Sequence, residues 1–379
     1  MTEAQHAPRI AAVDVARAVA LAGMFAVHLV PFDAPAPLGW LHRVSSGTAS
    51  ATFAVLAGVG LGLATRSGLA HTARARTVVR GLCLVVVGLV VGLVPTPAAI
   101  ILVYYGVLFV VAAAFLRFGP GTLAALALVA ALGTPVLSYV LRQNGLDSVA
   151  FENLGLLSLP APGALVSTVL LTGYYPVLTW TTYLLAGLAI GRLDLRSTRV
   201  AGSLLGAGVA AAGVAVVTGA VAVHVAGGVA GLNARLAGSP QPGADLTDRG
   251  PDLLHDTFFG VTPLHDPVWL LVRAPHSGSV TDLLYTTGVA VAVLGLALLV
   301  VPRRWAGWPL AAAGSMTLTL YTLHVITLGA LPAEPEATLS AVALVVELAA
   351  AVAFALACGA PRERGPLEEG VARVVRRVA

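Results

Sequence analysis

The sequence predicts an all-α, polytopic integral membrane protein. Hydrophobic residues make up 58% of its 379 residues and charged residues only 11%, whereas about a quarter of the residues in an average soluble domain are charged. The mean hydropathy is +0.89. The apolar runs are long and unbroken, which favours membrane-spanning helices over the short alternating strands of a membrane barrel.

About ten apolar segments are candidates for membrane-spanning helices, each of which needs about 20 residues. Arginines gather in every second connection between these segments and in the C-terminal tail. Because cytoplasmic loops carry the excess of positive charge, we expect both termini on the cytoplasmic side. The predicted spans are residues 10–30, 46–65, 81–94, 98–116, 121–141, 174–190 (with an apolar lead at 163–172), 200–229, 281–301, 310–331 and 337–358.

The chain is expected to form one membrane domain over residues 1–360, followed by a basic cytoplasmic tail over residues 361–379. The longest connection, residues 230–280, is polar and rich in turns, and the predicted orientation places it on the outer face. Whether it is a lid or part of an acceptor site stays open. The tail is either a solvated positive segment or an amphipathic helix on the membrane lipid of the inner leaflet.

The composition argues against several other classes of function. The net charge of +4 comes from arginines in short connections, which does not suggest a nucleic-acid partner. Cys83 and Cys358 both lie in apolar runs, as is typical of small buried hydrophobic residues. We therefore expect neither a disulfide framework nor a metal site.

The first predicted span carries three ionisable residues, Asp14, Arg17 and His28. Eleven positions separate Arg17 from His28, which is almost three turns at about 3.6 residues per turn, so both share one face roughly 16 Å apart. Asp14 lies one turn before Arg17 and can pair with it. These residues are either interfacial anchors at a helix end or the lining of a polar cavity, and their common face favours the cavity.

Other polar groups lie in or beside later spans. His324 falls in the middle of the segment 310–331, which is rich in hydroxyl groups, and an ionisable residue at that depth indicates a function. The aromatic residues that open the sixth span are either interfacial anchors or part of a site. His42 and His276 precede the second and eighth spans on the predicted outer side. The aromatic residues are Tyr174, Tyr175 and Trp180.

The first span also carries a family resemblance. The run Arg9-Ile-Ala-Ala-Val-Asp14-Val-Ala-Arg17-Ala-Val-Ala-Leu-Ala-Gly-Met-Phe-Ala-Val-His28 resembles the opening helix of the transmembrane acyltransferase superfamily, with an arginine, ten residues and a histidine. The rest of the chain is similar to bacterial relatives of heparan-alpha-glucosaminide N-acetyltransferase. The supporting segments are Phe53-Ala-Val-Leu-Ala-Gly58, Tyr104-Tyr-Gly-Val-Leu108, Gly173-Tyr-Tyr-Pro-Val-Leu-Thr-Trp180, Pro275-His-Ser-Gly278 and Leu318-Thr-Leu-Tyr-Thr-Leu-His324.

The resemblance implies a multi-pass O- or N-acyltransferase of the plasma membrane and cell envelope. Such an enzyme takes an acyl group, here expected to be acetyl, from acyl-CoA on the cytoplasmic side to a glycan or glycolipid acceptor on the outer face. By the resemblance and the positions above, we expect acyl-CoA to be bound by Asp14, Arg17, Tyr174, Tyr175, Trp180 and His324. We expect the catalytic residues to be His28, His42 and His276.

The chain departs from the family pattern at two positions. Ala18 stands where the family often has a glycine after the motif arginine. In heparan-type members the position of His28 often holds an amide, and the active histidine lies in the following outer loop, where His42 is nearest here. The choice of base between His28 and His42 therefore stays open, and the common face with Arg17 favours His28.

Two other classes of protein remain as alternatives to the enzyme. A transporter or lipid-handling protein would also use intramembrane ionisable groups and interrupted helices, although the sequence has no evident internal repeat. A non-catalytic relative would keep the scaffold without the chemistry. The acceptor, the acyl chain length and the oligomeric state stay open, with a homodimer as one alternative.

Overall fold

The computed structural model describes residues 9–66, 70–146, 152–236, 254, 258–301, 309–331, 337–359 and 364–378. Within these ranges all regular structure is helical, as the sequence predicts. The helices are α1 (Ala11–Leu29), α2 (Leu38–Ser45), α3 (Thr48–Ala64), α4 (Ala70–Val91), α5 (Leu102–Ala112), α6 (Pro120–Gln143), η1 (Leu156–Ser158), α7 (Pro162–Ser167), η2 (Thr168–Thr172), α8 (Val177–Gly191), α9 (Thr198–Val225), α10 (Gly228–Leu236), η5 (Pro267–Leu270), α11 (Val280–Val300), α12 (Pro309–Ser315), α13 (Thr317–Leu328), α14 (Ala337–Ala357) and α15 (Pro366–Val378).

Each of the ten predicted spans coincides with one helix or with two consecutive helices. Among the described residues, five helices are long and apolar enough to cross a membrane, and seven spans result if each of two bent pairs counts as one. The bent pairs are α2 with α3 and α12 with α13. The chain is therefore a multi-pass membrane protein, while ten spans and cytoplasmic termini stay predictions.

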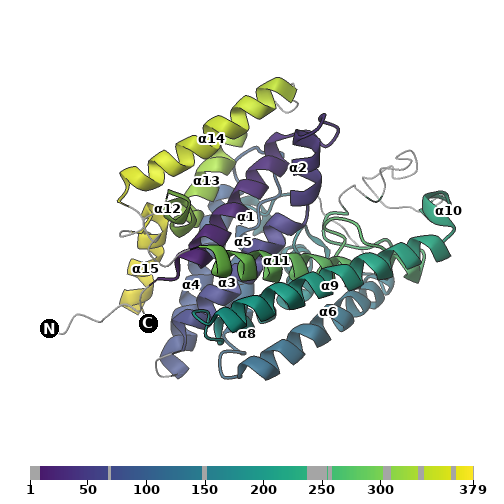
Figure 1. Ribbon diagram of the computed structural model, residues 1–379, viewed down its shortest axis with the longest axis horizontal. Helices are drawn as coiled ribbons and strands as arrows, with labels where there is room; N and C mark the ends of the chain where they lie inside the picture. Colours follow the sequence, from purple (N-terminus) through teal and green to yellow (C-terminus); the bar gives the residue numbers. More distant parts are fainter. Residues whose placement is uncertain are drawn as a thin grey trace.

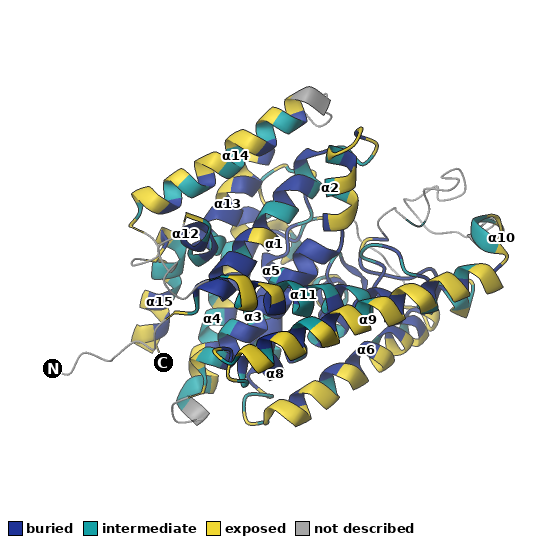
Figure 2. Ribbon diagram, in the orientation of Figure 1, coloured by how far each residue is buried: buried dark blue, intermediate teal, exposed yellow. Residues whose placement is uncertain are grey.

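Helix α1 lies near the centre of the bundle, and α14, α9 and α6 lie toward its outside (Figure 1). The burial colours agree, because α14, α9 and α6 expose most of one face, whereas the central helices are largely buried (Figure 2). The exposed faces are apolar, with Val217 and Val345 63% and 66% exposed. Such surfaces suit contact with lipid, where an apolar face needs no cover from water.

Small residues let several helices approach closely. On α3, a methyl group added to Gly58 would lie 2.9 Å from the Cα of Gly187 on α8, and one added to Gly62 would lie 2.8 Å from the Cα of Gly191. Gly58 and Gly62 are four residues apart on α3, and Gly187 and Gly191 are four residues apart on α8. This spacing puts the two glycines of each helix on one face. Close backbone approach of this kind is a common basis of helix association in membranes.

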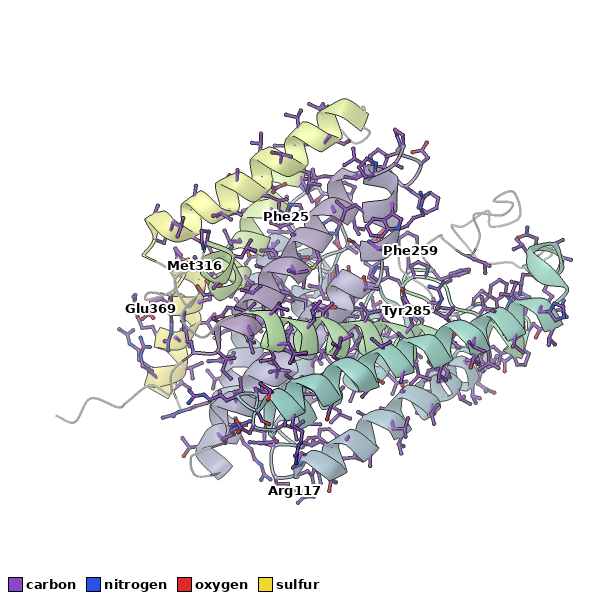
Figure 3. All side chains as sticks on the ribbon, in the orientation of Figure 1. Phe25, Arg117, Phe259, Tyr285, Met316 and Glu369 are labelled. Carbon is purple, nitrogen blue, oxygen red and sulfur yellow. The ribbon has the colours of Figure 1, made fainter. Side chains whose placement is uncertain are left out.

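The predicted ninth span, residues 310–331, contains a break that the sequence did not predict. It is not one helix but two, α12 and α13, which meet at an angle of 83° at Met316 (Figure 3). The break is stabilised by Glu368 of α15, which accepts hydrogen bonds from the backbone N–H of Leu318 (2.7 Å) and Thr319 (3.2 Å) and from the Thr319 hydroxyl (2.5 Å). A distant carboxylate thus satisfies the donors that a new helix start leaves free.

The tail contains an amphipathic helix, α15, which packs against α4 and α13. Ala372 and Val375 are its buried residues. The start of α1 and α15 lie at the same side of the bundle (Figure 1). Of the long connection 230–280, residues 237–253 and 255–257 lie outside the described residues, and the remainder holds the end of α10 and the short helix η5.

Candidate active site

One cavity of about 300 Å³ is lined by four arginines and is called here the arginine pocket. Its walls come from α1, α3, α4, α5, α12, α13 and α15 and from residues just before α1, α5 and α15. Of the described residues that line it, Glu368 is the one acidic side chain, and that carboxylate is engaged by the start of α13. The four arginines are Arg9, Arg17, Arg80 and Arg364.

Arg17 is held in place by its own helix and by α3. Its Nη1 lies 3.0 Å from Asp14 Oδ1, and Nη2 donates to the carbonyl of Leu56 at 3.5 Å. A methyl group on Gly60 would collide with Nη2 of Arg17, so only glycine at that position lets the guanidinium lie against α3. The predicted Asp14–Arg17 pair is thereby confirmed.

Of the four arginines in the pocket, Arg80 is the one whose positive charge is least compensated by nearby groups. It is partly buried, and the like charges of Arg364 and Arg17 act on it. Within the described part of the chain no carboxylate pairs with it. A guanidinium held beside other guanidiniums raises the positive potential of the cavity. The arginine pocket is thus suited to a ligand with several negative charges, since guanidinium groups bind phosphates strongly.

A second cavity, of about 270 Å³, is lined by three histidines and is called here the histidine pocket. Its other polar and aromatic lining comes from Ser46, Tyr174, Tyr175 and Phe259. Phe259, labelled in Figure 3, packs edge-on against Tyr174 with 5.6 Å between ring centroids. The three histidines are His28, His42 and His276.

A narrow cavity of about 20 Å³, called here the throat, lies between the two pockets. It shares Ile101 and Tyr321 with the arginine pocket, and it shares His28, Tyr175 and His276 with the histidine pocket. The two larger cavities are therefore neighbours across a constriction, and His28 lies where the throat meets the histidine pocket.

His28 is the first member of a hydrogen-bonded chain of three side chains. Its Nδ1 lies 2.9 Å from Nε2 of His324 on α13, and Nδ1 of His324 lies 2.7 Å from Oε1 of Glu347 on α14. The Thr327 hydroxyl donates to the same Oε1 at 2.9 Å. Phe25, labelled in Figure 3, stacks on the His324 ring with 4.0 Å between centroids.

The other two histidines of the pocket are held by backbone groups. His42 Nδ1 lies 2.7 Å from the carbonyl of Val30, so it carries the proton. His276 Nε2 accepts from the N–H of Gly47 at 3.2 Å, so that nitrogen is unprotonated. Burial lowers the pKa of His276 from its ordinary value of 6.5 to about 4, because the charged ring is poorly solvated there.

Backbone strain marks the segment that supplies Phe259 and His276. Both residues adopt positive φ angles, 47° and 55°, which are unusual for residues other than glycine and tend to gather at functional sites. The N–H of Gly260 donates to the carbonyl of His276 at 2.6 Å, and the buried Arg142 binds the carbonyl and hydroxyl of Thr262 at 2.8 and 2.9 Å. The fold thus holds these side chains at the edge of the pocket.

The residues predicted to bind the donor are distributed over both cavities. Arg17 lines the arginine pocket, Tyr174 and Tyr175 line the histidine pocket, and His324 lies behind His28. Trp180 is buried behind Tyr175, with 4.8 Å between ring centroids, and lines none of the three cavities. The three predicted catalytic histidines are brought together.

Two residues were missed by the reasoning from sequence. Arg80 looks like one of several loop arginines, and its place in a cavity follows from the fold. Glu347 had a local signal, because it is the one charged residue in the apolar helix α14, and a carboxylate in the middle of such a helix is costly unless it has a function. Within the described residues, no group of three histidines, cysteines or carboxylates has the arrangement of a metal site.

Comparison with known families places the arginine of the first helix and much of the histidine pocket in one recognised domain. Residues 9–222, more than half of the chain, match the family described as heparan-alpha-glucosaminide N-acetyltransferase, catalytic. The match ends before His276, His324 and Glu347. A search of curated proteins found no match. The extent of the family match shows that the chain belongs to the heparan-alpha-glucosaminide N-acetyltransferase catalytic family.

Proposed function

We propose that the protein transfers an acetyl group from acetyl-CoA, held from the cytoplasmic side in the arginine pocket, to a hydroxyl or amine of a glycan or glycolipid in the histidine pocket. Family membership supports an acetyltransferase that works at the membrane. The observation that carries the proposal is the meeting of a cationic cavity and a histidine-lined cavity at one throat, beside His28.

The donor suits the arginine pocket by charge and by shape. Coenzyme A carries several phosphate charges at one end and a thin chain with two amides leading to the thioester. The arginines would bind the phosphates, and the thin chain would extend toward the throat. Tyr105 lines the arginine pocket, and its hydroxyl is buried without a hydrogen-bond partner among the described residues, so it is available to an amide of the donor.

The throat favours a small acyl group. Its volume of about 20 Å³ is lined in part by the aromatic rings of Tyr175 and Tyr321, and protein interiors of this kind resist expansion. An acetyl group needs little room beyond the thioester, whereas a long acyl chain needs a cavity of its own. This supports acetyl-CoA over long-chain acyl-CoA as donor.

His28 is the proposed general base. Its Nδ1 faces His324, so Nε2 is the nitrogen left for the acceptor hydroxyl or amine. That nitrogen removes the acceptor's proton as the acceptor attacks the thioester carbonyl, and coenzyme A leaves as a thiolate that is then protonated. General base catalysis of this kind contributes about 10²- to 10⁴-fold to the rate.

His42 and His276 fit supporting roles in acceptor binding. Both already engage a backbone group through one ring nitrogen, so each offers the other nitrogen to a ligand. With Phe259 and Tyr174 beside them, they form a surface that combines aromatic faces with polar groups, as carbohydrate sites commonly do.

The test measures binding and turnover in the same purified protein. In detergent, acetyl-CoA binding is followed by calorimetry, and acetyl transfer is followed with glucosamine as the probe acceptor. We expect His28→Ala to bind acetyl-CoA normally and to lose turnover by at least 100-fold, and Arg17→Ala to bind it more weakly. Arg74→Ala, an exposed arginine of α4 outside the pocket, is the control for loss of charge.

A different outcome would redirect the assignment. A folded wild-type protein that binds no acyl-CoA would point to the transporter or lipid-handling alternative. A protein that binds acetyl-CoA but shows the same slow hydrolysis with and without His28 would point to a relative that has lost catalysis.

A further inference from the structure

We propose that His324 and Glu347 turn His28 into the first member of a two-histidine proton relay, in which the acceptor's proton is held as a positive charge on His324 beside Glu347. The inference rests on the proposed function of His28 and adds a second proton carrier, His324, and a positioning residue, Glu347. Both lie outside the region matched to the family.

The hydrogen bonds fix the direction of the relay. A carboxylate of Glu347 only accepts, so Nδ1 of His324 carries a proton toward it. In neutral His324 the other nitrogen, Nε2, is then an acceptor. It accepts a hydrogen bond from the protonated Nδ1 of His28. His28 is left with an unprotonated Nε2 directed away from His324, which is the form that a general base requires.

Glu347 lies at a position where a carboxylate is energetically unfavourable, which indicates that it has a function. It stands in the middle of α14, directly after two exposed valines, Val345 and Val346, and its own side chain is only 17% exposed. Placing a carboxylate at such a position in a membrane helix is unfavourable. Its two contacts, with His324 and Thr327, turn it toward α1 and α13 and away from lipid.

The proton can be followed through every step. As the acceptor's oxygen or nitrogen attacks the thioester, its proton moves to Nε2 of His28, and the Nδ1 proton of His28 moves to Nε2 of His324. His28 is neutral again and His324 is a cation 2.7 Å from Glu347. When the carbon–sulfur bond breaks, both protons return in the reverse order, and Nε2 of His28 protonates the leaving thiolate.

The relay places the charge where the protein compensates it best. A cation on His28 would face His42 and His276 and no described carboxylate within hydrogen-bond distance, whereas a cation on His324 has an anionic neighbour. An opposite charge at this distance stabilises the charged form.

Kinetics with conservative variants test the roles. Glu347→Gln keeps the shape and the polar contact but removes the charge, and we expect kcat to fall about 10- to 100-fold while KM for acetyl-CoA stays within about two-fold. Glu347→Asp should recover part of the loss. Val346→Ala, on the exposed face of the same helix, is the control for helix packing. Wild-type kcat in Glu347→Gln would overturn the proposal.

The pH profile gives a readout that a purely structural role would not move. Among the described residues, the other titratable side chains that line the two cavities beside His28 are His42, His276, Tyr174, Tyr175 and Tyr321. We expect the acidic limb of kcat against pH to move to lower pH in Glu347→Gln, because the cation on His324 loses its partner, and to keep its position in Val346→Ala. If kcat falls in Glu347→Gln but the acidic limb of the profile keeps its position, Glu347 has only a packing role and the relay is overturned.

A spectroscopic test separates the relay from the enzyme activity. In protein with ¹⁵N-labelled histidine and no substrate, we expect His28 to show one tautomer, protonated at Nδ1, and to show a mixture in Glu347→Gln. If that change is seen in a protein that transfers no acetyl group, the proposed function fails and the relay stands. If His28 is unchanged in Glu347→Gln while the wild type is active, the relay fails and the function stands.

Discussion

The arginine pocket and the histidine pocket are close in size, about 300 Å³ and about 270 Å³, yet they differ in almost every chemical respect. The first contains guanidiniums that repel one another, with Arg80 lacking a paired carboxylate among the described residues. The second contains imidazoles, each held by a hydrogen bond to a backbone group or to another ring.

The difference separates recognition from chemistry. Fixed positive charge attracts a polyanion and cannot exchange protons, because the guanidinium stays protonated. Hydrogen-bonded imidazoles can accept and return a proton but bind an anion weakly while neutral. The throat shares lining residues with both pockets, so in the proposed function the donor's phosphates would be bound on one side and its thioester would react on the other.

The largest expected effect is a loss of stability in acid caused by His276. Its pKa of about 4 in the folded protein lies below the ordinary value of 6.5, so between these values the unfolded chain binds a proton that the folded protein does not. Stability is therefore complete above about pH 6.5 and falls as the pH drops toward 4, by about 2 kcal/mol at pH 5 and about 3 kcal/mol at pH 4. The thermal midpoint in detergent at pH 7 and pH 5 measures it.

His276→Gln provides the matched control, because its amide oxygen can still accept from Gly47. The variant should lose less of its thermal midpoint between pH 7 and pH 5 than the wild type does. Arg80→Ala changes the other pocket and leaves His276 in place, so this variant should follow the wild type. Equal losses in wild type and His276→Gln would refute the assignment of the acid sensitivity to this ring.

The next effect is on donor affinity and belongs to the arginine pocket alone. Loss of one charge-assisted hydrogen bond costs about 1.5–3 kcal/mol, so Arg80→Ala should raise the Kd for acetyl-CoA by about 10- to 100-fold. Turnover at saturating donor should change little. Calorimetry beside Arg74→Ala checks the prediction, and equal weakening in both variants would show that general charge, and not the pocket, attracts the donor.

The sequence predicted the parts of this arrangement that lie on one helix. Arg17 and His28 are connected by helical periodicity, so their common face and their wide separation follow from spacing. Arg17 lines the arginine pocket and His28 lines the histidine pocket, which agrees with that expectation. The all-helical fold and the positions of the helices also follow from hydropathy.

The remaining features depend on contacts between segments far apart in sequence. The hydroxyl-rich run 310–331 looks like one continuous helix by composition. The break at Met316 is not evident in it, because the group that caps the break, Glu368, comes from another helix. The connection from Glu347 to His28 crosses three helices. Trp180 resembles the tyrosines before it in the sequence, yet its place on the helix turns it behind Tyr175.

A smaller effect on donor affinity is expected from Gly60. Alanine there would collide with Nη2 of Arg17, so Gly60→Ala should displace the guanidinium and weaken acetyl-CoA binding by about three- to ten-fold, which corresponds to about 0.7–1.4 kcal/mol. Gly133→Ala is the matched control, because Gly133 lies in α6 with nothing within 4 Å of an added methyl. Alanine is the better helix former by up to about 1 kcal/mol, so neither variant should unfold, and unaltered binding in Gly60→Ala would show that Arg17 does not contact the donor.

The smallest effect should come from Glu368, the acidic residue in the lining of the arginine pocket. Glu368→Gln keeps an oxygen to accept from Leu318 and Thr319 but removes a negative charge from a cavity that is proposed to bind phosphates. We expect acetyl-CoA to bind two- to five-fold more tightly, which corresponds to about 0.4–1 kcal/mol, with the gain shrinking as salt screens the charge. Weaker binding in this variant would mean that the carboxylate serves the pocket mainly by holding α13 and α15 together, so that the shape of the wall outweighs its charge.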